Sequence, residues 1–93
     1  MNTAYLLMAQ FESPTVALKD IALQYLGMTP GEAQREANMN RLPIPTFRLR
    51  DSQKAPLMIK VDDLAKHIDN IHAIAMTAWK NSQIKKVSTS RSY

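Results

Sequence analysis

The sequence contains no cysteine, only two glycines and one tryptophan. Without cysteine, the chain has neither a disulfide framework nor a thiolate metal site. No Gly-rich phosphate loop is present, and no apolar run approaches the roughly 18 residues that a membrane-spanning helix needs. The N-terminus lacks the basic region and the small-residue cleavage site of a signal peptide. We therefore expect a cytoplasmic protein that does not associate with a membrane.

Residue patterns for catalysis and metal binding are also missing. His67 and His72 are five residues apart, about 140° around a helix, so they do not form a two-histidine ligand pair. Asp63 and His67 have i, i+4 spacing, which is more typical of an interaction on a helix surface than of a metal site. Ser52 has no neighbouring base that would activate it as a nucleophile. The sequence therefore predicts no enzyme activity, no cofactor and no metal site.

Acidic residues are scarce in two parts of the chain. The 93 residues carry a net charge of +4, but residues 35–60 hold six basic and two acidic side chains, and residues 80–93 hold four basic and no acidic ones. Such blocks suit a polyanionic partner, although they also occur as ordinary solvated faces. With 45% hydrophobic residues, the chain has the composition of one globular domain.

The first part of the chain predicts two helices with an extended segment between them. Residues 3–11 are an apolar run of good helix formers with Thr3 as a suitable N-cap, although a buried strand is also compatible with so short a run. Residues 15–18 then read as extended and lead into a second helix. This helix ends at Gly27, because glycine adopts the left-handed backbone of a helix end without strain.

A third helix is predicted two residues later. Thr29 and Glu32 have the spacing of a capping box, and Pro30 occupies the first helical position, where its missing N–H is not needed. Ala33 and Ala37 face the body of the protein. The exposed side of this helix then carries four polar residues, namely Gln34, Arg35, Asn38 and Arg41.

Two alternating runs follow, at residues 46–50 and 56–61, and the polar residues 51–55 between them predict a β-hairpin. Residues 62–80 have the strongest helical pattern, with Asp62 as a cap. The expected fold is therefore mainly α with a small β-hairpin (α+β), arranged as a winged helix-turn-helix with a long C-terminal helix. We assign residues 1–79 to this domain and residues 80–93 to a basic, Ser-rich, disordered tail.

Four motifs carry a resemblance to a known family. They are YLLMAQF near the N-terminus, LGMTP, LPIPTFRL and DSQKAP. Together they resemble the pyocin-activator (PrtN-type) family of small bacterial and prophage regulators, over roughly residues 3–75. The combination of LPxPTxR with SQKxP is the specific part of the resemblance. Membership implies a DNA-binding transcriptional activator of prophage- or bacteriocin-type genes.

The third helix and the hairpin, or wing, supply the side chains for contact with double-stranded DNA. Arginine suits guanine, while asparagine and glutamine suit adenine, so we expect the helix in the major groove. In the wing, Arg48 and Arg50 would share a strand face that Lys60 extends, and the tip would contact phosphates or the minor groove. The alternative is an ordinary solvated surface. The candidate DNA-binding residues are Thr29, Gln34, Arg35, Asn38, Arg41, Arg48, Arg50, Ser52, Gln53, Lys54 and Lys60.

The long helix also predicts a homodimer. Its inward-facing stripe is expected to consist of Leu64, Ile68, Ile71 and Ala75. Ile74, Ala78 and Trp79 would then remain partly exposed and form the dimer interface, which would match two DNA half-sites. In the alternative, Trp79 folds back on the N-terminal helix and completes a monomeric core.

Two other functions remain open. An excisionase-like architectural protein would bend DNA with the same helix and wing, whereas a protein-binding adaptor or antirepressor would use the wing on an acidic protein. An activator also needs a contact with the transcription machinery, such as RNA polymerase, and the sequence does not locate that surface.

Overall fold

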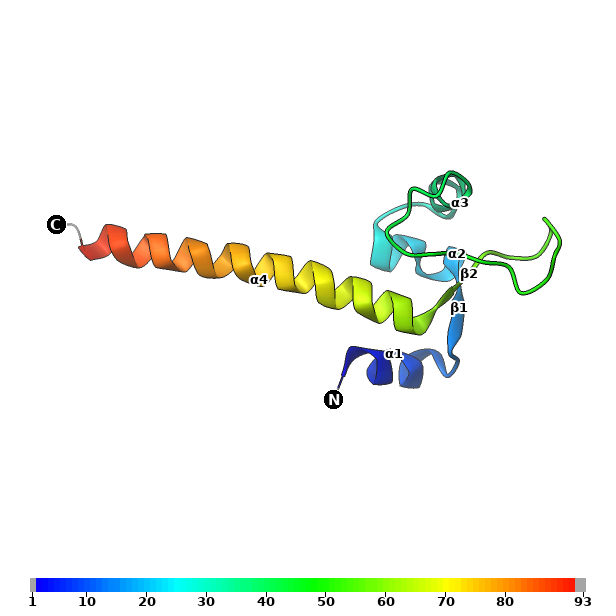
Figure 1. Cartoon of the computed structure of the whole chain (residues 1–93), viewed down its shortest axis with the longest axis horizontal. Helices are drawn as coiled ribbons and strands as arrows, with labels where there is room; N and C mark the ends of the chain where they lie inside the picture. The colour runs from blue at the N-terminus through cyan, green and yellow to red at the C-terminus, as the bar shows by residue number, and fades with distance from the viewer. Residues whose placement is uncertain (1, 92–93) are drawn as a thin grey trace.

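The computed structural model describes residues 2–91, with side chains described as far as residue 84, and consists of a small body with one long projecting helix (Figure 1). Its dimensions are 66 × 30 × 16 Å. The fold is mainly helical with a two-stranded antiparallel sheet, so the predicted α+β class is confirmed. The elements are α1 (Thr3–Phe11), β1 (Thr15–Ala17), α2 (Leu18–Ile21), η1 (Ala22–Leu26), α3 (Pro30–Asn38), β2 (Met58–Lys60) and α4 (Val61–Arg91).

Helix α1 spans the predicted residues, so the alternative of a buried strand is wrong. Its N-cap is Asn2 and not Thr3: the Asn2 side chain accepts a 2.7 Å hydrogen bond from the backbone N–H of Tyr5. Thr3 is already inside the helix, and its hydroxyl donates to Asp69 of α4 instead. The cap therefore lies one residue earlier than predicted, and Thr3 connects two helices.

The helices α2, η1 and α3 follow the prediction closely. Gly27 has φ 66° and ends η1, which continues α2 as a π-helical turn that the sequence did not predict. Thr29 and Glu32 form both hydrogen bonds of the capping box, and Pro30 occupies the first position of α3. Helix α3 ends at Asn38, two residues earlier than predicted, because Asn40 adopts a left-handed backbone with φ 53°.

The predicted hairpin is reduced to a single bridge between Phe47 and Met58. Strand β2 instead pairs with β1, in a register that places Val16 opposite Ile59. Residues 48–57, here called the central loop, have no strand structure. One physical reason is Pro56, which cannot donate a hydrogen bond to a strand ladder. The predicted strand face shared by Arg48, Arg50 and Lys60 therefore does not form.

The core joins every element of the body. The side chains of Ile21, Ala22, Ala33, Ile59, Val61 and Leu64 are fully buried, and Leu7, Leu18, Ala37, Ile44 and Ala65 are nearly so. Ala33 and Ala37 face the core as predicted, which turns the opposite side of α3 to solvent. Ile44 anchors the segment between α3 and the central loop. Both α3 and the central loop are thus held against one apolar centre.

Helix α4 begins at Val61, whose backbone N–H donates a 2.9 Å hydrogen bond to the carbonyl of Pro14. Asp62 therefore lies within the first turn and not at the cap, in a position where the helix dipole favours negative charge. The sequence predicts an end near Lys80, but the helix continues to Arg91, because no proline or glycine follows Pro56. The remaining tail residues 92–93, and the side chains from residue 85 onward, lie outside the described part.

None of the helices in the described part of the chain is both long enough and apolar enough to span a bilayer.

Candidate nucleic-acid interface

The exposed side of α3 is the first component of the site. Because Ala33 and Ala37 are buried, Gln34, Arg35 and Asn38 are turned to solvent, as predicted. Gln34 and Asn38 are four residues apart, so they lie one above the other on the same side of the helix. Their amides offer both donors and acceptors. Arg35 lies about 100° further around the helix.

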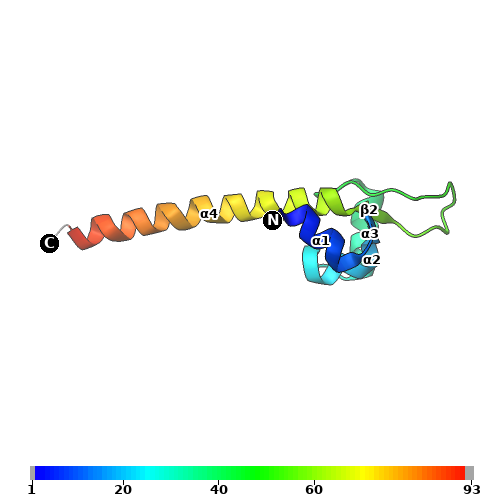
Figure 2. The same cartoon turned by 90° about the horizontal axis from the view of Figure 1, so that it is seen from below.

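The central loop is the second component, and it projects from the body at the end opposite to α4 (Figures 1 and 2). Its tip is a tight turn in which the backbone N–H of Ala55 donates to the carbonyl of Ser52 over 3.1 Å. The Ser52 hydroxyl also accepts a 3.2 Å hydrogen bond from the backbone N–H of Lys54. Across the loop, Nε of Arg48 donates to the carbonyl of Ala55 over 3.1 Å. Arg48 therefore fixes the loop's two arms to each other.

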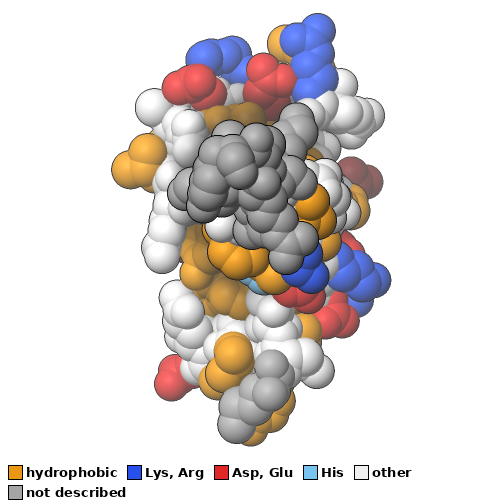
Figure 3. All heavy atoms as spheres, turned by 90° about the vertical axis from the view of Figure 1, so that its left-hand side faces the viewer, with side chains coloured by type: hydrophobic (Ala, Val, Ile, Leu, Met, Phe, Trp, Pro, Cys, Tyr) orange, Lys and Arg blue, Asp and Glu red, His pale blue; other side chains and the backbone are white. Residues whose placement is uncertain are grey.

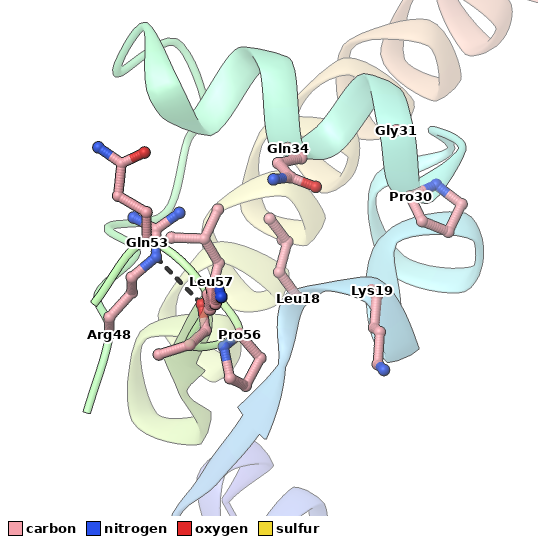
Figure 4. Close-up of a pocket in the computed structure, with 11 residues that line it drawn as sticks. Leu18, Lys19, Pro30, Gly31, Gln34, Arg48, Gln53, Pro56 and Leu57 are labelled. Atoms are coloured by element: carbon pink, nitrogen blue, oxygen red, sulfur yellow. Dashed lines mark hydrogen bonds between the residues drawn. The ribbon is translucent and has the colours of Figure 1, made fainter. Parts of the chain in front are cut away.

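A hollow of about 350 Å³ separates the first turn of α3 from the central loop (Figure 4). Leu18 and Leu57 provide apolar parts of its wall, while Gln34 of α3 and Gln53 of the loop provide polar parts. Three cationic side chains also line it, namely Lys19, Arg48 and Lys54. The sequence did not select Lys19, because its position beside the loop depends on tertiary packing that no local pattern encodes.

A second hollow, of about 590 Å³, lies between the last turn of α3 and the same loop. Asn38 lines its helix side, and Arg50, Asp51 and Ser52 line its loop side. Arg48, Gln53 and Leu57 border both hollows. The two hollows therefore form one concave face along α3, which we call the α3–loop face. It brings together Gln34, Asn38, Arg48, Arg50, Ser52, Gln53 and Lys54.

Four predicted residues lie outside the α3–loop face. The Thr29 hydroxyl is engaged in the capping box, where it accepts from the backbone of Glu32. Arg35 and Arg41 are exposed but line neither hollow, and Arg41 follows the end of α3. Lys60 is exposed on β2, opposite Thr15, and it also lines neither hollow.

Within the described residues, no group of three or more His, Asp or Glu side chains could hold a metal ion.

Comparison with known protein families gives a match, and this match covers the whole body. The model of one family, described as pyocin activator protein PrtN, matches residues 3–75. The match includes α1, the helices α2 to α3, both strands, the central loop and the first half of α4. No curated protein and no solved structure matches the chain.

Proposed function

The chain belongs to the pyocin activator protein PrtN family, as its four motifs predict, and on this premise we propose that it is a sequence-specific DNA-binding activator of prophage- or bacteriocin-type genes. The family is one of regulators of pyocin genes and not one of enzymes.

The order of elements supports a winged helix-turn-helix. Helices α2–η1 and α3 are joined by a turn at Gly27 and supply the helix-turn-helix pair. The central loop follows, and its ends meet at the Phe47–Met58 bridge, next to the β1–β2 pair. A loop held in this way beside a second, exposed helix has the position of a wing. In this proposal α3 is the recognition helix and the central loop is the wing.

The α3–loop face is the single observation that carries the proposal. Gln34 and Asn38 enter the major groove with α3 and pair with base edges, adenine being the preferred partner of both side chains. Arg35, beside them on the exposed helix, contacts guanine. One DNA backbone runs along the concave face between helix and loop, where Lys19 and Lys54 neutralise its phosphates.

Arg48 has a mixed role in this arrangement. Its Nε holds the loop through the Ala55 carbonyl. Its terminal guanidinium nitrogens are then directed to the phosphates, at a site where the loop is already fixed. A preorganised cation of this kind loses less side-chain entropy on binding than a free lysine does.

The test is fluorescence anisotropy with DNA from upstream of the regulated genes and with a scrambled duplex, each at about 50 and 200 mM salt. Tighter binding to the upstream DNA at the higher salt supports a sequence-specific regulator. Equal binding to both duplexes that collapses at 200 mM contradicts it. That result would favour a protein-binding adaptor or antirepressor, in which the same cations meet an acidic protein.

One observation favours a second candidate function, the bending of DNA. Leu49 is 72% exposed on the projecting loop and is flanked by Arg48 and Arg50. Architectural proteins insert apolar side chains between base pairs from the minor groove, with neighbouring arginines on the backbone. A leucine in this position would unstack one base step and kink the duplex.

A further inference from the structure

Helix α4 leaves the body with an apolar surface that nothing in the described chain covers. Its first turns are buried through Val61, Leu64 and Ala65, and every residue from 69 to 82 is exposed. Ile71 is 51% exposed and Ile74 61% exposed. A helix of this kind gains most of its stability in water from tertiary packing of its apolar side. The projecting part of α4 therefore lacks the contacts that would normally hold it.

Four of the exposed apolar residues lie along one side of α4. At about 100° per residue, Ile71, Ile74, Ala75 and Ala78 fall within an arc of about 100°, and we call this set the α4 stripe. The arc includes the direction of Leu64 but not those of Val61 and Ala65, so the stripe overlaps one edge of the side of the helix that is buried in the body. Seen from the end of α4, hydrophobic side chains gather beside the helix end and charged ones lie mostly towards the rim (Figure 3).

Trp79 lies at the edge of the α4 stripe, about 40° beyond Ala75. It is 57% exposed, so it does not fold back on α1, and the predicted alternative of a monomeric core closed by this side chain is wrong. An aromatic side chain at the border of a stripe is well placed to cover the flank of an incoming helix.

We propose that the α4 stripe is covered by the same stripe of a second copy of this chain, with the two helices antiparallel. The distribution of charge along α4 indicates both the partner and the relative direction of the two helices. Residues 61–70 contain three aspartates and one lysine, whereas residues 80–91 contain four basic residues and no acidic one. A parallel pair would bring two basic ends together, but an antiparallel pair sets each basic end beside the partner's acidic start.

The residue sizes fit this pairing. The stripe has its small residues, Ala75 and Ala78, in its C-terminal half, and small side chains allow two helix backbones to approach closely. A two-fold axis midway between them sets Ala75 against the partner's Ala78 and Ile71 near the partner's Ser82, in the self-complementary manner of a two-fold interface. The stripe has four residues, fewer than the roughly 20–30 residues per side of a standard interface, so the dimer should dissociate at roughly micromolar concentration.

Sedimentation equilibrium of the full chain without DNA tests whether the α4 stripe mediates association of two copies. The expected mass rises with concentration from 10.5 kDa to twice that value. Ile74→Glu places a charge in the stripe and should weaken association at least about tenfold. Ile84→Glu is the matched control, since Ile84 is 65% exposed on the same helix but about 130° from the stripe's centre. A wild-type chain that stays monomeric, or equal effects of both variants, overturns the proposal.

Because the chain has no cysteine, single introduced thiols report the direction of the pair. Disulfides need Cα atoms within about 7 Å. In the antiparallel pair, a mixture of Ile71→Cys and Ser82→Cys chains should cross-link to each other, while Ser82→Cys alone should not. The reverse pattern indicates a parallel pair, and no cross-link in either sample contradicts the proposed register.

These measurements contain no DNA, so the dimer and the proposed DNA-binding function can fail independently of each other.

Discussion

The hydroxyl of Thr3 donates a 2.6 Å hydrogen bond to a carboxylate oxygen of Asp69 and so joins the start of α1 to α4 across 66 positions of sequence. Beyond Asp69, exposed residues occupy the whole circumference of α4 as far as residue 82. The bond therefore marks the point where the body ends and the projecting part of α4 begins.

Removing this bond should lower the stability of the body. We expect Thr3→Val to reduce the free energy of unfolding by about 1 kcal/mol, because the bond is exposed to solvent and contributes only its net value. Urea unfolding at one fixed protein concentration measures this change in the free energy of unfolding. Thr77→Val is the control, since the Thr77 hydroxyl bonds only to Ala73 within α4. If both variants unfold alike, the bond between α1 and α4 does not support the body.

Arg35→Ala should reduce the preference for upstream DNA over scrambled DNA. The expected loss is about 1–3 kcal/mol of discrimination, because an arginine that pairs with guanine contributes mainly to base recognition. Competition binding at about 200 mM salt measures the ratio of the two affinities. Equal losses on both duplexes would remove Arg35 from base recognition.

Lys54→Ala should weaken binding to both duplexes alike. A lysine that contacts a phosphate releases about one counterion, so the slope of log affinity against log salt should become shallower by about one unit.

Lys19→Ala should behave in the same way as Lys54→Ala, because Lys19 lines the same hollow. Lys66→Ala is the control for both variants: Lys66 is an exposed lysine on α4, away from the central loop. An unchanged salt slope for Lys19→Ala would place the DNA backbone outside the first hollow.

Leu49→Ala should decrease DNA bending more than DNA affinity. Loss of the apolar wedge removes the unstacking of a base step, while the neighbouring arginines keep their phosphate contacts. A ligation-based bending assay reports the angle and anisotropy reports the affinity. The matched control is Leu23→Ala, because Leu23 is 73% exposed on η1 and lies off the α3–loop face. A straight complex with the wild-type chain would exclude the bending function.

Local signals in the sequence predicted α3 and its exposed face well. The capping box of Thr29 and Glu32 and the left-handed Gly27 depend on a few neighbouring residues, so their geometry can be read without the rest of the fold. The burial of Ala33 and Ala37 then follows from helical spacing alone.

Contacts between distant segments were not predictable in the same way. The alternating runs around the central loop indicated a hairpin, but β2 pairs with β1, which lies more than 40 residues earlier in the sequence. Alternation shows that a segment is extended without showing which segment it pairs with. For the same reason, neither the bond of Thr3 to Asp69 nor the position of Lys19 in the hollow had a sequence signal.

The length of α4 has a consequence for the DNA that such a pair would read. With 31 residues at about 1.5 Å each, α4 is about 46 Å long. An antiparallel pair holds the two bodies at opposite ends of this rod, further apart than the roughly 34 Å of one DNA turn. The two recognition sequences should therefore lie more than one turn of the duplex apart, and the number of residues in α4 would set the distance between them.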